Sequence, residues 1–225
     1  MTTHTFRDNL RYHDTIYGVL PGVTTVLSQT QDPYKARSIK QWQSRVGDVE
    51  AKRLKQAGLD RGNFIHNQIE DYLTKDGEWL IPYPLSHQYR SLSQSFQTFI
   101  NASVRDVIYL EIGFASLDGY GGSPDLVGTD ENGIVTLFDW KTSGKYKTKS
   151  QVKDYFVQIA AYWTMVEQET DVKIESACIV IGYSDLDKGK DGLKQWSITR
   201  HEKDVLYAQF LERLARFERL NKVGF

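Results

Sequence analysis

The sequence predicts an α/β fold in which helices flank a mixed central sheet and a mainly helical part precedes it. Apolar side chains recur at helical spacing over 34–74 and 86–103. From residue 107 onward, short apolar runs separated by turn residues indicate strands. A further helical pattern over 150–168 lies between two groups of these strands, as a crossover connection requires. These observations favour a meander of strands, a crossover helix and then more strands.

The N-terminal part begins with short strand-like pieces over 1–30, which glycine and proline interrupt. In the long helical pattern that follows, Ile65, Ile69 and Tyr72 share one helix face. His66 lies at the edge of this apolar stripe. A polar side chain at such an edge is available for either packing or function.

The predicted sheet begins with alternating apolar residues from Val107 to Phe114. The next two strands follow Asp125 and lead to Asp139, and the turn signal Thr-Asp-Glu-Asn-Gly between them predicts a hairpin. Two more strands and a closing amphipathic helix are expected near 174–183, 193–199 and 202–221.

The chain of 225 residues has the size of one large domain. We expect this single domain to comprise a mainly helical part over 1–105, a sheet core over 106–200 and a C-terminal helix over 201–225. The formal net charge of −1 excludes nucleic-acid binding by bulk positive charge, so any such contact must use a local basic patch. We expect a monomer.

Cys178 is the single cysteine, which excludes both an internal disulfide and a cysteine-ligated iron–sulfur cluster. It lies in an apolar run, so we expect a buried core residue in a reducing compartment. No apolar run approaches the roughly 20 residues that a membrane span requires. The first residues resemble neither a signal peptide nor a transit peptide. We therefore expect a cytoplasmic protein without membrane contact.

Two short motifs carry the chemistry: a Gly-Ser-Pro-Asp turn that ends at Asp125, and the run Asp-Trp-Lys from Asp139 to Lys141. Side chains alternate along a strand, so Asp139 and Lys141 point to the same face, about 6–7 Å apart. The predicted hairpin brings Asp125 beside them. Clustered carboxylates repel unless a hard cation such as Mg²⁺ lies between them, and a nearby lysine can stabilise charge developing on a phosphate. This arrangement is typical of metal-assisted phosphodiester hydrolysis.

With these motifs the chain resembles the PD-(D/E)XK nucleases. Downstream, Gln158 and Tyr162 lie four residues apart on one helix face, and the resulting series of motifs is that of the RecB-like branch of the superfamily. Upstream, the run from Gly62 through His66 to Glu70 resembles the helix that supplies a histidine to the metal in the same branch. The resemblance implies a restriction-endonuclease-like core.

The N-terminal part narrows the resemblance to the small single-strand exonucleases of phages, a group with a mitochondrial member. It is carried by Leu-Pro-Gly-Val-Thr-Thr-Val-Leu over 20–27 and by the run from Lys40 to Gly47, and it extends over about 19–165. The chain departs from the group at Pro124, Asn63 and Trp140, which affects fine specificity rather than chemistry.

The resemblance implies a Mg²⁺- or Mn²⁺-dependent DNA exonuclease, without an iron–sulfur cluster, that acts on single strands or frayed ends. It implies that Asp125 and Asp139 hold one or two metal ions with His66 and the backbone carbonyl of Trp140, and that Lys141 is catalytic. Gln158 and Tyr162 would orient DNA or the lysine.

Each site residue also has a structural interpretation. Asp125 can be a turn acid, and Asp139 with Lys141 can be a solvent-facing charge pair, although the carboxylate ends a buried stripe. A histidine at the edge of an apolar face, such as His66, is usually a satisfied core residue. Two further acids stay candidates: Glu70 as a metal ligand or a hydrogen-bond partner of His66, and Glu111 as an inward-facing strand residue near the metal or paired with a lysine.

Basic residues supply the candidates for DNA contact. A loop with three lysines, here called the lysine loop, directly follows the predicted strand of Asp139 and Lys141. Tyr146 within this loop makes phosphate contact with base stacking plausible. Such lysine-rich loops are usually only solvated. Trp42 and Trp163 are more often core residues than stacking platforms. The candidates are Lys145, Lys147 and Lys149 in the loop, and more weakly Arg45, Arg53 and Arg61 on the N-terminal helices.

Three other functions fit the same residues. A structure-selective or sequence-specific endonuclease would use the same core, and a circular single strand distinguishes it from an exonuclease. A non-catalytic DNA-binding module is disfavoured because both aspartates and the lysine are present. A metal-binding protein of unrelated function would not require Lys141 or Gln158.

Overall fold

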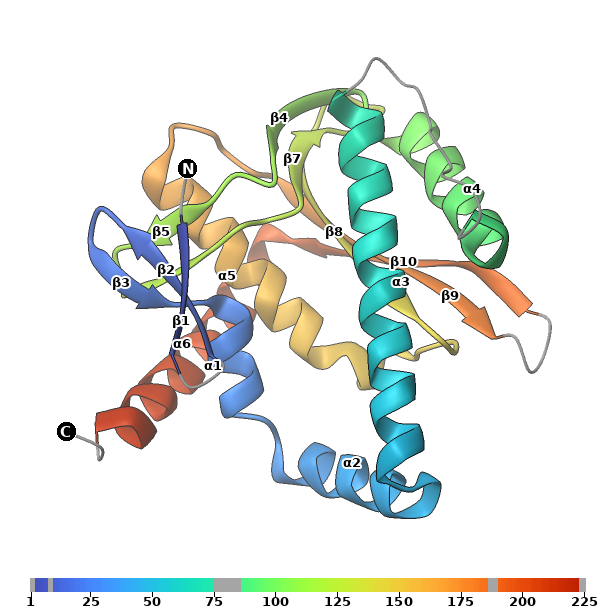
Figure 1. The fold of residues 1–225 in the computed structure, drawn as a ribbon. Helices are drawn as coiled ribbons and strands as arrows, with labels where there is room; N and C mark the ends of the chain where they lie inside the picture. The colour runs from blue at the N-terminus through green and yellow to red at the C-terminus, as the bar shows by residue number, and fades with distance from the viewer. Residues whose placement is uncertain (1–2, 8–9, 75–85, 186–189, 223–225) are drawn as a thin grey trace.

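The structure is a computed structural model that describes residues 3–7, 10–74, 86–185 and 190–222 (Figure 1). Its central sheet has five strands in the order β10–β9–β8–β7–β4. The meander comprises β4 (Asp106–Leu110), β7 (Leu126–Thr129) and β8 (Val135–Ser143), each antiparallel to its neighbour. The hairpin predicted between the two aspartates is the β7–β8 pair.

The chain leaves β8 through the short 3-10 helix η1 (Lys149–Val152) and the crossover helix α5 (Lys153–Glu169). It returns as β9 (Ser176–Asp185), which pairs with β8 in parallel. β10 (Lys190–Thr199) then adds an antiparallel edge, and α6 (Arg200–Lys222) follows. The mixed sheet with helices on both faces confirms the predicted fold class.

Two hydrophobic cores lie on opposite faces of the sheet, and alternate residues of β8 divide between them. Leu137 packs in the core that contains most of α5 and the inner face of α6. Phe138 and Trp140 pack in the other core, against α3 (Asp48–Thr74) and α4 (Ser86–Ser103). By this alternation Asp139 and Lys141 point to the α5 face.

The N-terminal residues form a three-stranded sheet of β1 (Thr3–Arg7), β2 (Leu10–Thr15) and β3 (Gly18–Pro21), followed by α1 (Val23–Gln29). The expectation of strand-like pieces as far as residue 30 is therefore wrong for its last part. Val23, Val26 and Leu27 have the spacing of one helix face, and all three are buried where α1 packs on α5 and α6. A separate ribbon pairs β5 (Phe114–Ser116) with β6 (Tyr120–Gly122).

The helical pattern predicted over 34–74 is two helices, α2 (Pro33–Val46) and α3. The chain turns between them at Gly47, whose φ of 85° lies in the region that glycine tolerates best. Asp32 caps α2 by accepting a 2.8 Å hydrogen bond from the backbone N–H of Tyr34. Although α2 has 14 residues, none of them is buried.

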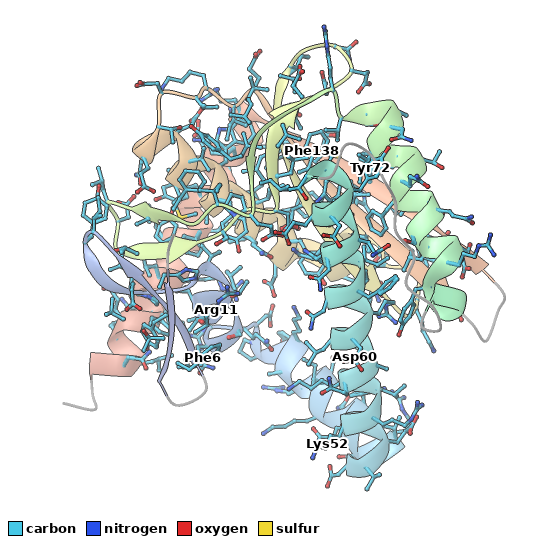
Figure 2. The ribbon with its side chains drawn as sticks, turned by 45° about the horizontal axis from the view of Figure 1, so that its top comes forward. Phe6, Arg11, Lys52, Asp60, Tyr72 and Phe138 are labelled. Carbon is cyan, nitrogen blue, oxygen red and sulfur yellow. The ribbon has the colours of Figure 1, made fainter. Side chains whose placement is uncertain are left out.

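Only the second half of α3 packs on the sheet. Ile65 and Ile69 are fully buried in the core shared with α4, as the predicted stripe requires. In Figure 2 the labelled Lys52 and Asp60 lie on the half of α3 that extends away from the sheet, and Tyr72 lies on the half beside it. The chain from α1 through α2 to α3 thus leaves the core and returns to it (Figure 1).

Cys178 lies on β9 in the core, and burial raises the pKa of its thiol to about 11, which confirms the predicted buried residue. Trp163 is likewise fully buried. Within the described part of the chain, every helix is too short or too polar to cross a membrane.

Candidate active site

The two aspartates of the motifs face each other across the β7–β8 hairpin. Leu126 pairs with Phe138, so Asp125 and Asp139 occupy the next opposed positions of the same register. The Oδ2 atom of Asp125 accepts a 2.6 Å hydrogen bond from the backbone N–H of Trp140. Asp139 is completely buried, and this burial raises the pKa of its carboxyl to about 6 although Lys141 acts in the opposite direction.

Lys141 is held at this carboxylate pair by contacts on two sides. Its Nζ donates a 2.6 Å hydrogen bond to Asp139, and it lies 5.5 Å from the centre of the Tyr155 ring. Burial by itself would lower the pKa of Lys141, but the carboxylates of Asp139 and Asp125 outweigh burial and raise it. The lysine is therefore held in its charged form beside the two carboxylates.

His66 projects from α3 towards the same hairpin. Its Nε2 lies 3.0 Å from the carbonyl oxygen of Trp140. Its Nδ1 lies 3.6 Å from Oδ1 of Asp125 and 3.7 Å from Oε1 of Glu111. Burial lowers the pKa of His66, but the carboxylate of Asp125 and then that of Glu111 outweigh burial and raise it. A hydrogen bond from Nε2–H to the Trp140 carbonyl leaves the Nδ1 lone pair directed at the two carboxylates.

Glu111 reaches the site from beyond the end of a strand. The expectation of a strand from Val107 to Phe114 is wrong here, because β4 ends at Leu110 and Glu111 adopts a left-handed backbone with φ 51°. A hydrogen bond of 3.0 Å from its backbone N–H to the carbonyl of Asp125 holds this conformation. A non-glycine residue in this region is strained, and such strain is concentrated at functional sites.

His66, Glu111 and Asp125 form a group that fits a divalent cation. One ligand atom from each lies within 4.8 Å of the others. The separations of 3.6 and 3.7 Å exceed a hydrogen bond. Two ligands at about 2.1 Å from Mg²⁺ are roughly 3.0 Å apart when adjacent and roughly 4.2 Å apart when opposite, and the two observed separations lie between these values. Within the described ranges this group does not include Asp139, whose carboxylate is paired with Lys141.

The second acidic candidate of the sequence analysis, on α3, lies beside this group. Glu70 is exposed one helical turn after His66. Both residues line a surface pocket of about 340 Å³ together with Gly62 and Glu111. The structure thus brings Glu70 to the mouth of the site without giving it a hydrogen bond to His66 among the contacts of the described residues.

Gln158 and Tyr162 lie on the face of α5 that covers the site. Gln158 Nε2 donates a 3.2 Å hydrogen bond to the Tyr162 hydroxyl, and both side chains are buried. Burial raises the pKa of Tyr162 to about 12. The tyrosine ring lies against Gly122 so closely that a Cβ there would come within 2.7 Å of it. The glycine of the Gly-Ser-Pro-Asp motif is therefore required by packing against the Gln-x-x-x-Tyr helix.

The sequence reasoning missed Tyr155, which contacts the ammonium group of Lys141. The signal was its position three residues before Gln158, which places both on one face of α5.

The basic candidates occupy different places. Arg61 is half-buried on α3, five residues before His66, with its guanidinium beside Gly144 of the loop after β8. Its Nε is buried without a hydrogen-bond partner, and no carboxylate within the described residues pairs with the side chain. Burial accordingly lowers the pKa of Arg61. By contrast Arg53 is exposed and ion-paired with Glu50.

The lysine loop and α2 supply the other cations. Lys149 stacks over Phe156 at 5.2 Å, and Lys147 lines a groove beside α2. Lys145 and Arg45 are exposed. The lysine loop and Arg61 therefore lie on two segments that border β8, the strand of Asp139 and Lys141.

Comparison with known proteins finds one similar curated sequence. No known protein-family profile matches it. It is similar to mitochondrial genome maintenance exonuclease 1 of Xenopus tropicalis, with 27% identity over 185 residues that cover 75% of this chain and 50% of the relative. This similarity confirms the resemblance that the motifs indicated. The chain spans about half the length of that curated relative.

Two solved structures overlap with the fold in part. One is a protein from Eubacterium rectale described as an exonuclease, with 12% identity, coverage of 73% of this chain and 69% of the other, and a TM-score of 0.46. The second is an alkaline exonuclease from Laribacter hongkongensis, with 15% identity, coverage of 72% and 84%, and a TM-score of 0.33.

Proposed function

We propose that the protein is a Mg²⁺- or Mn²⁺-dependent exonuclease that hydrolyses phosphodiester bonds of single-stranded DNA or frayed ends. One observation carries the proposal. The ligand atoms of His66, Glu111 and Asp125 converge within 4.8 Å, beside a charged lysine that is ion-paired to Asp139. Such a cluster offers a hard cation its preferred oxygen ligands and places a fixed positive charge next to them.

His66, Glu111 and Asp125 would hold the cation, and Asp139 would join them or bind a second one. A cation bound there supplies Lewis-acid activation of water and neutralises charge on the phosphate. The group is partly open to solvent, because the side chain of His66 is 29% exposed and that of Glu111 is 33% exposed. This exposure leaves room for a phosphodiester.

Lys141 provides the second positive charge of the reaction. Because its pKa is raised, Nζ keeps its protons and can donate to a phosphoryl oxygen as negative charge develops there. Asp139 and the Tyr155 ring restrict the position of Nζ before substrate binds. The Gln158–Tyr162 pair packs behind this lysine and stabilises the wall of the site.

DNA as the substrate is supported by the similarity to the mitochondrial exonuclease and by Arg61. No carboxylate in the described ranges pairs with its half-buried guanidinium, which therefore loses hydration without gaining an ion pair there. This is costly unless an anion binds it. A nucleic-acid phosphate next to the catalytic strand meets this need.

Action on a free single-stranded end is supported by the path of the chain. The segment from α1 through α2 to α3 leaves the core and returns to it with the second half of α3 (Figure 1), and a strand held between this segment and the core would have to enter by an end. With a net charge of −1 the protein also lacks the overall positive charge that would bind duplex DNA non-specifically.

Labelled DNA tests the proposal. Linear single strands carrying a 5′ or 3′ label should be degraded to short products with Mg²⁺ or Mn²⁺, while Ca²⁺ should bind without turnover. Closed circular single strands and blunt duplexes should resist. Cleavage that survives a chelator contradicts the metal dependence, and rapid cutting of the circle establishes the endonuclease alternative.

A further inference from the structure

A groove of about 700 Å³ runs between α2 and the start of α5, outside the metal-binding group. Tyr34, Ile39 and Trp42 of α2 line one side. Lys147, from the lysine loop, and Lys153, from the first turn of α5, line the other. One wall is therefore rich in aromatic and apolar surface, and the other is basic.

The aromatic wall belongs to a helix that buries nothing in the protein core. Tyr34 is 76% exposed and Ile39 is 43% exposed, while Trp42 is half-buried. Most helices in folded proteins gain their stability by packing an apolar face against another element. On α2 the exposed Tyr34 and Ile39 line the groove instead, and an uncovered apolar face of this kind marks a surface for interaction.

The basic wall carries positive charge that no carboxylate among the described residues neutralises. The groove also contains Asp32 and Asp154, but both are engaged. Asp32 caps α2, and Asp154 forms ion pairs of 2.6 Å with Lys35 and 2.5 Å with Arg213. Among the ion pairs of the described residues, none involves Lys147 or Lys153. Two lysines are thus available to a polyanion.

The groove adjoins the catalytic centre through the first turn of α5. Lys153 and Asp154 line the groove, and the next residue, Tyr155, presents its ring to Lys141. Lys147 lies six residues after the catalytic lysine on the loop that leaves β8. A strand whose phosphate lies at Lys141 therefore has its neighbouring nucleotides near the groove.

We propose that this groove is a binding site for unpaired nucleotides, in which Trp42 and Tyr34 stack on bases while Lys147 and Lys153 contact phosphates. The proposal rests on the proposed action on single-stranded DNA and adds a site remote from the metal. Planar aromatic side chains facing unpaired cations match the alternation of base and phosphate along a single strand. A duplex hides its bases and cannot use the aromatic wall.

Binding in the presence of a chelator tests the site without any cleavage. The probes are fluorescent oligothymidines of 4 and 20 nucleotides and a 20-base-pair duplex. We expect the wild-type protein to bind the 20-mer far more tightly than the 4-mer or the duplex. Trp42→Ala and Tyr34→Ala should each weaken binding of the 20-mer about fivefold or more. Lys147→Ala with Lys153→Ala should weaken it and reduce its salt dependence.

Matched controls lie away from the groove. Tyr17→Ala removes an exposed aromatic side chain from the turn between β2 and β3, and Lys173→Ala removes an exposed lysine. Neither should change the dissociation constant of the 20-mer. Because Tyr34 is largely exposed, its replacement tests the site even if Trp42→Ala impairs folding.

Fluorescence gives a second readout. Binding of the 20-mer should quench tryptophan emission, and Trp42→Phe should lose most of the quenching while it keeps affinity within about threefold, since a phenyl ring still stacks. Equal affinity of the alanine variants and the wild type for the 20-mer overturns the proposal. A change of oligomeric state in Trp42→Ala without a change in DNA affinity also overturns it, because α2 would then contact protein.

The two proposals fail separately. If the protein does not cleave DNA but Trp42→Ala weakens its binding of the 20-mer, only the proposed function is contradicted. An enzyme that degrades single strands with unchanged affinity in the groove variants contradicts only the proposed groove.

Discussion

Asp125 uses its two carboxylate oxygens for different purposes. Oδ2 accepts a 2.6 Å hydrogen bond from the backbone N–H of Trp140, which fixes the side chain against the opposite strand. Oδ1 lies 3.6 Å from Nδ1 of His66, in the group that fits a cation. The hairpin therefore orients this carboxylate before any metal binds, which is the preorganisation that metal sites require.

Replacing Glu111 should separate metal binding from stability. Glu111→Gly removes a carboxylate from the metal group and relieves a left-handed backbone that costs a non-glycine residue about 1–2 kcal/mol. The greater freedom of glycine in the unfolded chain offsets this by about 0.4–1 kcal/mol. We expect Mn²⁺ affinity to fall at least tenfold while the free energy of unfolding in chelator stays within about 1 kcal/mol of wild type.

Titration with Mn²⁺ and denaturant unfolding measure these two quantities. Glu131→Gln, in the exposed turn between β7 and β8, is the control and should change neither. Unchanged Mn²⁺ affinity in Glu111→Gly contradicts the assigned ligand.

Lys141→Ala should abolish cleavage while Mn²⁺ binding persists, because the metal group of His66, Glu111 and Asp125 stays intact. Asp139 would lose its cation, so the pKa of its buried carboxyl should rise further above about 6. Single-turnover cleavage of a labelled strand measures the effect. Retention of a tenth of the wild-type rate, a barrier change of about 1.4 kcal/mol, contradicts the catalytic role.

Arg61→Gln should weaken single-strand binding without destabilising the fold. The half-buried guanidinium has no carboxylate partner among the described residues, so its removal eliminates a desolvation cost and breaks no ion pair. We expect the logarithmic salt slope of binding to decrease by about one phosphate contact. Arg53→Gln, on the same helix but exposed and paired with Glu50, should leave the slope unchanged. Equal slopes for all three proteins would show that Arg61 contacts no phosphate.

Asp154 should stabilise the protein in a pH-dependent manner. Burial raises the pKa of this carboxyl, but hydrogen bonds from Lys35 and Arg213 outweigh burial and lower it. A lowered pKa in the folded state contributes stability above the unfolded value of about 3.9, and this stability is lost as the pH falls through the folded value.

Asp154→Asn should therefore destabilise the protein by about 1–3 kcal/mol at pH 7. The difference from wild type should shrink as the pH falls below about 4. Urea unfolding at a series of pH values measures it, with the exposed Asp171→Asn as the control. A difference that is independent of pH would show that the ion pairs with Lys35 and Arg213 do not supply the stability.

The sequence by itself determined the elements whose signals are local. Alternation along β8 placed Asp139 and Lys141 on one face, and the turn signal before Val135 set the hairpin that opposes Asp125 to Asp139. Helical periodicity placed His66 at the edge of the buried stripe of α3. These features follow from the strand period of two residues and the helix period of 3.6 residues. The sequence shows both periods independently of how the elements pack together.

Only the tertiary structure decided the composition of the candidate metal group and the surroundings of its lysine. Glu111 joins His66 because the chain leaves β4 at Leu110 in a left-handed turn, which alternation does not encode. Tyr155 contacts Lys141 because the crossover helix α5 packs on the face of the sheet to which Lys141 points. The place of α2, with Trp42 turned to a groove, depends on the single break at Gly47 and on contacts between segments distant in sequence. Such contacts arise from the packing of whole elements, and local residue patterns do not specify them.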